Sequence, residues 1–275
     1  MLICSAASYE NQLSFLDPRR LAVRFLPSRS RAGYGSPGYC AMKIIKHVFE
    51  SSLGKKYLMA VTGFFLLAFV VAHLLGNLQV FLGPEAINRY GAFLQSNLEL
   101  LWPARLFLLA CVVLHTWSAA AVSVENQRAR PIGYGVSRPF GSTYASRHML
   151  MSGLIVAVFI IYHLLHYTVE LQAINGTGQN FATFVDPEKR HDVFRMMVAG
   201  FRNGWVSGFY LLGVGLLCLH LSHGASSMFQ SMGWRNDAYR PFLDKASRVV
   251  AVMIFLGYAS IPVAILLGYG KEALQ

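Results

Sequence analysis

The chain has 275 residues, of which 55% are hydrophobic and only 13% are charged, and its formal net charge is +11. A soluble domain of this length carries about a quarter charged residues, so the composition argues against a soluble protein. The four cysteines form no C-x-x-C or C-x-x-C-H pattern, which argues against a thiolate metal centre and against covalently attached haem.

Residues 1–41 precede the hydrophobic part of the chain. They are rich in Ser, Arg, Gly and Pro and contain no apolar core of signal-peptide length, a composition typical of a solvated, disordered tail. The basic segment that begins at Met42 looks like a conventional protein start. We therefore expect 1–41 to be a disordered or non-native extension and 42–275 to be the membrane domain, and we expect N-terminal sequencing of native protein to find Met42.

Five stretches, each almost free of charge, follow in chain order. They are 57–81, 103–124, 148–169, 205–228 and 246–268. Runs of about 20 apolar residues have the length that crosses ~30 Å of hydrocarbon as a helix. The sequence therefore predicts an all-α fold, an integral membrane bundle of five transmembrane helices in a lipid bilayer. The alternative is a set of fully buried helices in a large soluble protein.

The connections between these stretches carry turn-forming residues. Gly83-Pro84 and Trp102-Pro103 predict breaks between helices. The longest connection, 170–204, contains Asp186-Pro187, where we expect a short helix at the membrane surface to begin.

Lys and Arg are divided unevenly between the two sides of the membrane. If the helices alternate in direction, the segment before the first helix shares a side with the second–third and fourth–fifth connections. From residue 42 onward this side holds twelve Lys and Arg, and the other side holds seven. The positive-inside rule places the richer side, and with it the N-terminus, in the cytoplasm. The net charge is therefore a topology signal, and we expect no nucleic-acid partner.

Six of the nine histidines fall inside the predicted spans. They are His73, His115, His163, His166, His220 and His223. Ionisable residues in spans are rare and mark function by default, although a lone one often only bonds to a neighbouring helix. At 1.5 Å per residue, His73 and His163 both lie about 10–12 Å from the outer edge. His115 and His220 both lie about 12–14 Å from the cytoplasmic edge.

Two imidazoles that face each other at one depth, from different helices, suit a six-coordinate haem b. The depths therefore predict an outer haem between His73 and His163 and an inner haem between His115 and His220, with these four side chains as axial iron ligands. His166 and His223 follow three residues later on the same helix faces. Depth prefers the earlier histidine of each couple, and we expect the later ones to bond to a haem propionate or a backbone carbonyl.

Two softer features accompany the histidines. Gly63, Gly153, Gly213 and Gly215 lie in the same helices, where a missing side chain suits either a macrocycle or close helix packing. The spans carry no Asp or Glu away from their ends. This argues against a proton pump and favours a protein that passes electrons.

Several strings of residues connect the chain to a known family. The run Ser52-Leu-Gly-Lys-Lys-Tyr-Leu-Met-Ala-Val-Thr-Gly63 is followed in order by Ala72-His-Leu-Leu-Gly-Asn77, Leu114-His-Thr-Trp117, Tyr162-His-Leu-Leu-His166 and Leu219-His-Leu-Ser-His-Gly224. Over residues 47–270 the chain resembles the dihaem cytochrome b subunit, of the cytochrome b558 type, that anchors succinate:quinone oxidoreductases (complex II) in the membrane. The family's four axial ligands match His73, His115, His163 and His220.

The resemblance implies a function as the quinone-reactive, electron-transfer subunit of succinate dehydrogenase or fumarate reductase in a bacterial cytoplasmic (inner) membrane. It implies two haems b, with the outer one farther from the soluble subunits. It also implies a flavoprotein with FAD and an iron–sulfur protein as partners, and menaquinone or another quinone as substrate. Such a subunit does not oxidise succinate by itself.

The family binds quinone with polar residues near a haem edge. Outer candidates in the connection after the first span are Glu85, Asn88, Arg89, Gln95 and Glu99, each of which also suits an ordinary surface position. Basic residues near the inner helix ends, such as Lys55, are candidates to pair with haem propionates or with lipid phosphates.

Two other functions remain open at this point. One is a haem b subunit of another membrane oxidoreductase, of the hydrogenase, formate dehydrogenase or heterodisulfide reductase type. The other is a metal transporter that uses His-x-x-His pairs as transient zinc ligands.

Overall fold

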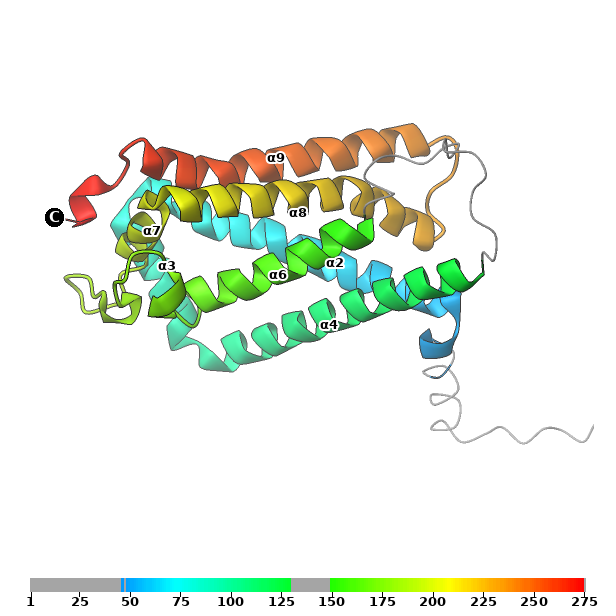
Figure 1. The fold of residues 1–275 in the computed structure, drawn as a ribbon, viewed down its shortest axis with the longest axis horizontal. Coiled ribbons are helices and arrows are strands. Elements are labelled where there is room, and N and C mark those ends of the chain that lie inside the picture. The colour runs from blue at the N-terminus through cyan, green and yellow to red at the C-terminus, as the bar shows by residue number, and fades with distance from the viewer. Residues whose placement is uncertain (1–45, 47, 130–148, 275) are drawn as a thin grey trace, which may run out of the picture. The chain divides into compact units, whose positions relative to one another are not determined.

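The structure is a computed structural model and describes residues 46, 48–129 and 149–274 (Figure 1). Within this part of the chain the regular elements are helices, and one isolated β-bridge joins Val185 to His191. The expectations for residues 1–41 lie outside the described residues, as do the basic residues Lys43, Arg130, Arg138 and Arg147.

Five helices are long and apolar enough to cross a membrane. They are α2 (Ser52–Asn77), α4 (Leu98–Arg128), α6 (Met149–Tyr167), α8 (Gly204–Ser231) and α9 (Arg240–Leu266). Many large apolar side chains on them are exposed, among them Phe64, Leu106 and Leu154. A helix satisfies its own backbone hydrogen bonds, so it can lie in hydrocarbon, and the exposed apolar side chains of these helices suit contact with lipid. The prediction of an all-α, multi-pass membrane bundle is confirmed.

The helices α2, α4, α8 and α9 begin earlier than their hydrophobic runs. Ser51 caps α2 by accepting a hydrogen bond from the Gly54 N–H, so the helix includes the polar residues before position 57. The predicted break at Trp102-Pro103 is wrong, because α4 begins at Leu98 and contains Pro103. A proline this close to a helix start removes a single backbone hydrogen bond, which a long apolar helix tolerates.

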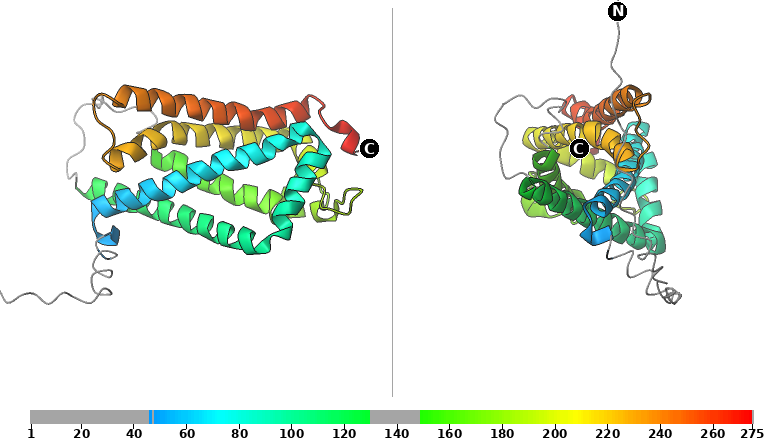
Figure 2. Two further views of the ribbon diagram at one scale, coloured as in Figure 1. Left: turned by 180° about the vertical axis from the view of Figure 1, so that it is seen from behind. Right: turned by 90° about the vertical axis from the view of Figure 1, so that its right-hand side faces the viewer.

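The packing of the five helices is uneven. α8 packs against α9, α6 and α2, and α2 also packs against α4 (Figures 1 and 2). One buried core cluster joins α2, α8 and α9 through Leu74, Val214, Cys218, Ala251 and Ile254. In contrast, α4 buries only three residues and α6 only two. Most side chains of α4 and α6 are therefore exposed or only partly buried.

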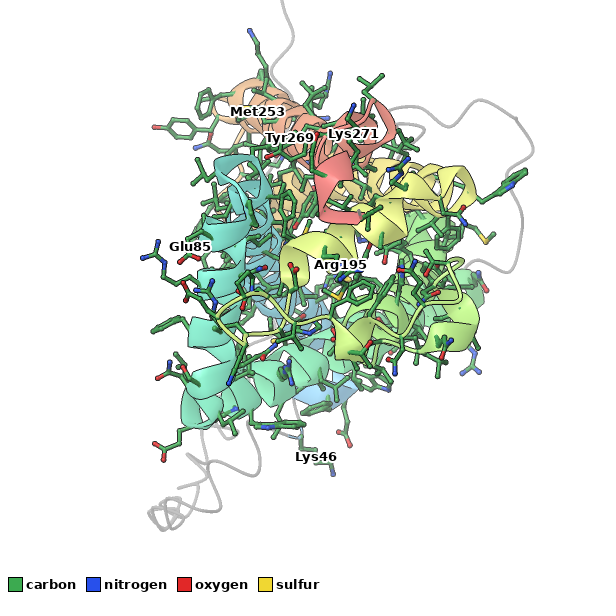
Figure 3. All side chains as sticks on the ribbon, turned by 90° about the vertical axis from the view of Figure 1, so that its left-hand side faces the viewer. Lys46, Glu85, Arg195, Met253, Tyr269 and Lys271 are labelled. Carbon is green, nitrogen blue, oxygen red and sulfur yellow. The ribbon has the colours of Figure 1, made fainter. Side chains whose placement is uncertain are left out.

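Two shorter helices lie across one end of the bundle, which we call the α7 end. They are α3 (Pro84–Ser96) and α7 (Val193–Arg202), and Figure 3 looks onto them. Seven of the ten residues of α7 are buried. The expected helix of this connection is thus present, but it begins at Val193 rather than Asp186, and most of it is buried. Its position at the membrane surface stays a prediction. Its N-cap is Asp192, which accepts a hydrogen bond from the Arg195 N–H.

Residues 84–96 are helical, whereas the quinone candidates in this region were expected in a loop. Gly83 has φ 99°, a left-handed conformation that glycine adopts without strain and that separates α3 from the short 3-10 helix Leu78–Leu82. Pro84 then occupies the first turn, where its missing N–H costs nothing. The predicted break at Gly83-Pro84 is therefore present, and Pro84 begins α3.

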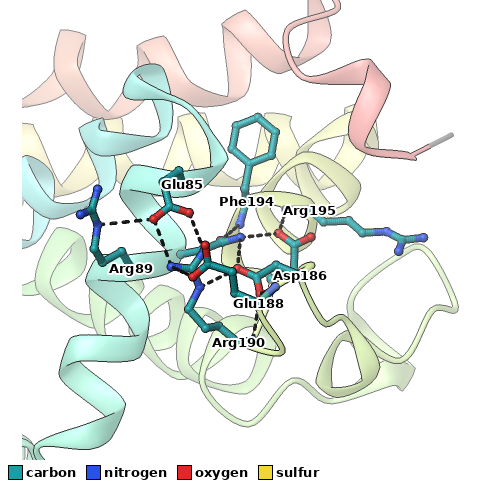
Figure 4. Close-up of polar contacts among 9 residues, drawn as sticks. Glu85, Arg89, Asp186, Glu188, Arg190, Phe194 and Arg195 are labelled. Atoms are coloured by element: carbon teal, nitrogen blue, oxygen red, sulfur yellow. Dashed lines mark hydrogen bonds and ion pairs between the residues drawn. The ribbon is translucent and has the colours of Figure 1, made fainter.

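An ion-pair cluster ties α3 to the connection before α7 (Figure 4). Arg190 Nη2 lies 2.6 Å from Glu85 Oε2, and Arg190 Nε lies 2.7 Å from Asp186 Oδ2. The hydrogen bond from Arg190 holds the pKa of Glu85 below its usual range. Burial raises the pKa of Asp186, but hydrogen bonds from the backbone and guanidinium of Arg190 outweigh it and leave that pKa lowered.

These lowered pKa values predict a loss of stability in acid. Because both carboxyls titrate lower in the folded chain than in the unfolded chain, their contribution is present at neutral pH and disappears as pH falls through the lowered values. We expect Arg190→Gln to lower the melting temperature at pH 7 and to lower it less as the carboxyls become protonated. Arg89→Gln, which removes only an exposed 3.6 Å pair with Glu85, is the control and should change little at either pH. If Arg190→Gln lowered the melting temperature by the same amount at every pH, this account would be contradicted.

Candidate functional site

His73 of α2 and His163 of α6 form the first pair. Their ring centroids are 5.7 Å apart and their ring planes are inclined by 78°. Each lies one turn before the last residue of its helix, Asn77 in α2 and Tyr167 in α6. The first pair therefore lies toward the α7 end.

His115 of α4 and His220 of α8 form the second pair. Their ring centroids are 6.3 Å apart and their ring planes are inclined by 67°. All four histidines are partly buried. The structure thus brings together the two couples that equal depth selects.

Two glycines mark the level of the second pair on the helices that carry the first pair, and so show how far apart the two pairs lie. A Cβ on Gly63 of α2 would lie 3.1 Å from Cε1 of His115, and a Cβ on Gly153 of α6 would lie 3.3 Å from Cε1 of His220. Each glycine precedes its helix's first-pair histidine by ten residues, so the two levels lie about 15 Å apart. These glycines make room for imidazole rings, and Gly213 makes room for the ring of Phe159.

The close approach at Gly63 predicts a specific effect of Gly63→Ala. The added methyl group would press on His115 and displace it by a few tenths of an ångström. We expect weaker retention of whatever the second pair binds, with the first pair unaffected. Gly215→Ala is the matched control, since a Cβ there meets Phe255 at an ordinary 3.7 Å. Equal ligand retention in the two purified variants would contradict the geometry.

Hydrogen bonds to Nδ1 orient three of the four rings. His115 Nδ1 lies 3.0 Å from the Met59 carbonyl oxygen, and His220 Nδ1 lies 3.3 Å from Ser152 Oγ. His163 Nδ1 lies 3.4 Å from the hydroxyl of Tyr210. Within the described residues, Nε2 of these rings forms no hydrogen bond. A metal-binding histidine characteristically holds one ring nitrogen this way and presents the other to the metal.

The pairs fit a haem iron by their separation and by their number of ligands. With iron–nitrogen bonds of about 2 Å on both faces of a porphyrin, the ring centroids should be about 6 Å apart, and the observed values are 5.7 and 6.3 Å. No group of three or more His, Cys, Asp or Glu that could hold a bare metal ion occurs within residues 46–129 and 149–274, apart from position 47, which was not searched. A structural zinc site uses about four such ligands. Two imidazoles suit a metal whose remaining ligands come from a macrocycle.

Comparisons with known proteins add nothing to this geometry. No family model, no curated protein and no solved structure matches the chain.

The second histidine of α6 has a clear position. His166 is fully buried, its Nδ1 lies 3.0 Å from the hydroxyl of Tyr210, and its ring stacks on Tyr167 at 4.0 Å. The partner of its Nδ1 is therefore a phenol. Of the two expected partners, a backbone carbonyl does not occupy this nitrogen, and a bond to a haem propionate stays a prediction. His223 lies one turn beyond His220 on α8 and is partly buried.

Sequence reasoning missed Tyr210. It precedes His220 by ten residues on α8, a rise of about 15 Å, and this places it at the level of the first pair. The same count of depth that paired the histidines would have found it.

The quinone candidates do not form a single site. Glu85 is held by Arg190, and Asn88 is buried among hydrogen bonds to Asp186, Asp192 and Phe194. Gln95 and Glu99 are exposed. Arg89 lies on an open groove, whose lining residues are Gln79, Ala86, Arg89, Tyr90 and Phe93.

Lys55 was a candidate for pairing with a haem propionate. Its ammonium group instead pairs with Glu125 of α4 and donates a hydrogen bond to the Glu50 carbonyl oxygen at 3.2 Å. Ser52 donates to the same Glu125 carboxylate at 2.5 Å. Lys55 therefore joins the start of α2 to the end of α4.

Proposed function

We propose that the chain is the membrane anchor and electron-transfer subunit of a succinate:quinone oxidoreductase or quinol:fumarate reductase. In this proposal it holds two haems b, one between His73 and His163 and one between His115 and His220. The observation that supports it most strongly is the presence of two imidazole pairs with iron-compatible separations, at levels about 15 Å apart in one bundle. The order of the histidine motifs along the chain, which resembles that of the dihaem cytochrome b family, supports the assignment to complex II.

The chain's own residues would hold and orient the two groups. Each histidine would present Nε2 to the iron from its own helix, while Met59, Ser152 and Tyr210 hold Nδ1 of three of the rings. Bound haem supplies one-electron oxidation and reduction at the iron. The helix α7 lies at the same end of the bundle as the first pair, with Gly200 next to His166 and Tyr167 of α6, and would limit the access of water there.

The remaining parts of the proposal follow from charge and from the family. The basic connections would face the cytoplasm, with the N-terminus on that side, and would dock a flavoprotein with FAD and an iron–sulfur protein. Menaquinone or another quinone would exchange electrons with the haems at the α7 end. Of the candidates Glu85, Arg89, Gln95 and Glu99, Arg89 is favoured because it lines the groove beside α3. The membrane would be a bacterial cytoplasmic membrane.

Purification of the full chain from native membranes tests this proposal. We expect a flavoprotein and an iron–sulfur protein to co-purify, and we expect succinate or a quinol to produce a b-type absorption band. Co-purification with hydrogenase, formate dehydrogenase or heterodisulfide reductase subunits would replace the proposal with another haem b subunit. Colourless protein that binds zinc would replace it with a transporter.

A further inference from the structure

Tyr210 lies between two histidines of α6. Its hydroxyl oxygen is 3.4 Å from Nδ1 of His163 and 3.0 Å from Nδ1 of His166. Tyr210 is 6% exposed and His166 is 0% exposed, so bulk water does not compete for these atoms.

At the second pair, Nδ1 of His115 faces the Met59 carbonyl oxygen and Thr62 Oγ1. Nδ1 of His220 faces Ser152 Oγ. Both hydroxyls donate to backbone carbonyl oxygens. A second histidine that accepts from the hydroxyl is therefore found, among the described residues, at the first pair and not at the second.

The hydrogen positions in this group follow from its chemistry. If Nε2 of His163 binds iron, its Nδ1 carries the hydrogen and can only donate. The Tyr210 oxygen must then accept that hydrogen bond, and its own hydroxyl hydrogen is free to be donated to Nδ1 of His166. His166 in turn carries its hydrogen on Nε2, which has no partner among the described residues. One set of hydrogens therefore satisfies both bonds to Tyr210, and they run in one direction from His163 to His166.

We propose that Tyr210 is a positioning residue that strengthens electron donation from His163 to its iron, and that His166 holds the hydroxyl of Tyr210 in the orientation this requires. The inference rests on the proposed function. An acceptor on the far nitrogen of a metal-bound imidazole makes the ligand more basic. A hydroxyl that donates its own hydrogen becomes a better acceptor. A more basic ligand stabilises ferric iron and so lowers the reduction potential of the first-pair haem.

Redox titration of membranes that contain the full chain tests the role of the hydroxyl. Tyr210→Phe removes one oxygen and keeps the ring that packs edge-on against Phe159 and Phe201. We expect the midpoint potential of the first-pair haem to rise and that of the second-pair haem to stay constant. Tyr162→Phe is the matched control, because its hydroxyl donates to the Ile174 carbonyl and to no candidate ligand. Tyr162→Phe should shift neither potential.

A pair of variants at His166 tests the second half of the proposal. His166→Phe removes the acceptor for the Tyr210 hydroxyl, and we expect a smaller rise of the same potential. His166→Asn places an amide oxygen near the position of Nδ1, and we expect the wild-type potential to return. This pair also decides the question if Tyr210→Phe fails to retain its haem.

The outcomes separate this inference from the proposed function. Unchanged potentials in Tyr210→Phe overturn the inference, as does an equal shift in Tyr162→Phe. Equal potentials in His166→Phe and His166→Asn also overturn it. Wild-type protein without haem would instead refute the proposed function before any variant is compared.

Discussion

His115→Ala is expected to remove one of two haems and to leave the other in place. His220→Ala is expected to remove the same haem, because the two rings face each other at 6.3 Å and each would supply one axial ligand. The difference spectrum of each purified variant should lose the same component of the b-type absorption band, about half of the haem. His73→Ala and His163→Ala should both remove the other component.

The best control for this result is His223→Ala. His223 lies on the same helix, three residues from His220, and in the proposed arrangement it binds no iron. Both haems should remain in that variant. If His115→Ala and His220→Ala removed different components, the pairing would be wrong.

Asn88→Ala is expected to loosen the α7 end of the bundle. Asn88 is 2% exposed, its Oδ1 accepts a hydrogen bond from the Phe194 N–H at 2.9 Å, and its Nδ2 donates to Asp192 at 3.0 Å. The substitution leaves a buried N–H without an acceptor, and with the lost bond to a carboxylate this costs about 3 kcal/mol. If α7 exchanges by local opening, its amides should exchange with deuterium about a hundredfold faster.

Asn97→Ala is the matched control for this prediction. Asn97 follows the same helix α3 but is exposed, and its side chain bonds only to its neighbours Phe93 and Ser96. Exchange in α7 should remain as in the wild type. Unchanged exchange in Asn88→Ala would show that this buried side chain does not hold α7 in place.

The membrane spans were predictable from the sequence because hydrophobicity alone determines them. The depth of each histidine in the membrane could also be counted, because a helix advances by a constant rise per residue from the edge of its hydrophobic run. That count was enough to select His73 with His163 and His115 with His220. The ends of the helices were less predictable, because caps such as Ser51 extend helices into polar sequence.

The elements at the α7 end were harder to predict because tertiary contacts decide them. α3 is a polar helix with no long hydrophobic run, and α7 reads as an amphipathic surface segment although most of it is buried. The pairing of Lys55 with Glu125 joins residues 70 positions apart, and no local pattern indicates it. The orientation of the N-terminus in the membrane stays a prediction.

The haem content of the purified wild-type chain tests the central claim most directly. Two imidazole pairs should hold two haems b per chain, released as protohaem by pyridine and alkali and counted against the protein concentration. A ratio near two is the predicted result. Protein that is pure, folded and free of haem, or that holds one haem per chain, would contradict it.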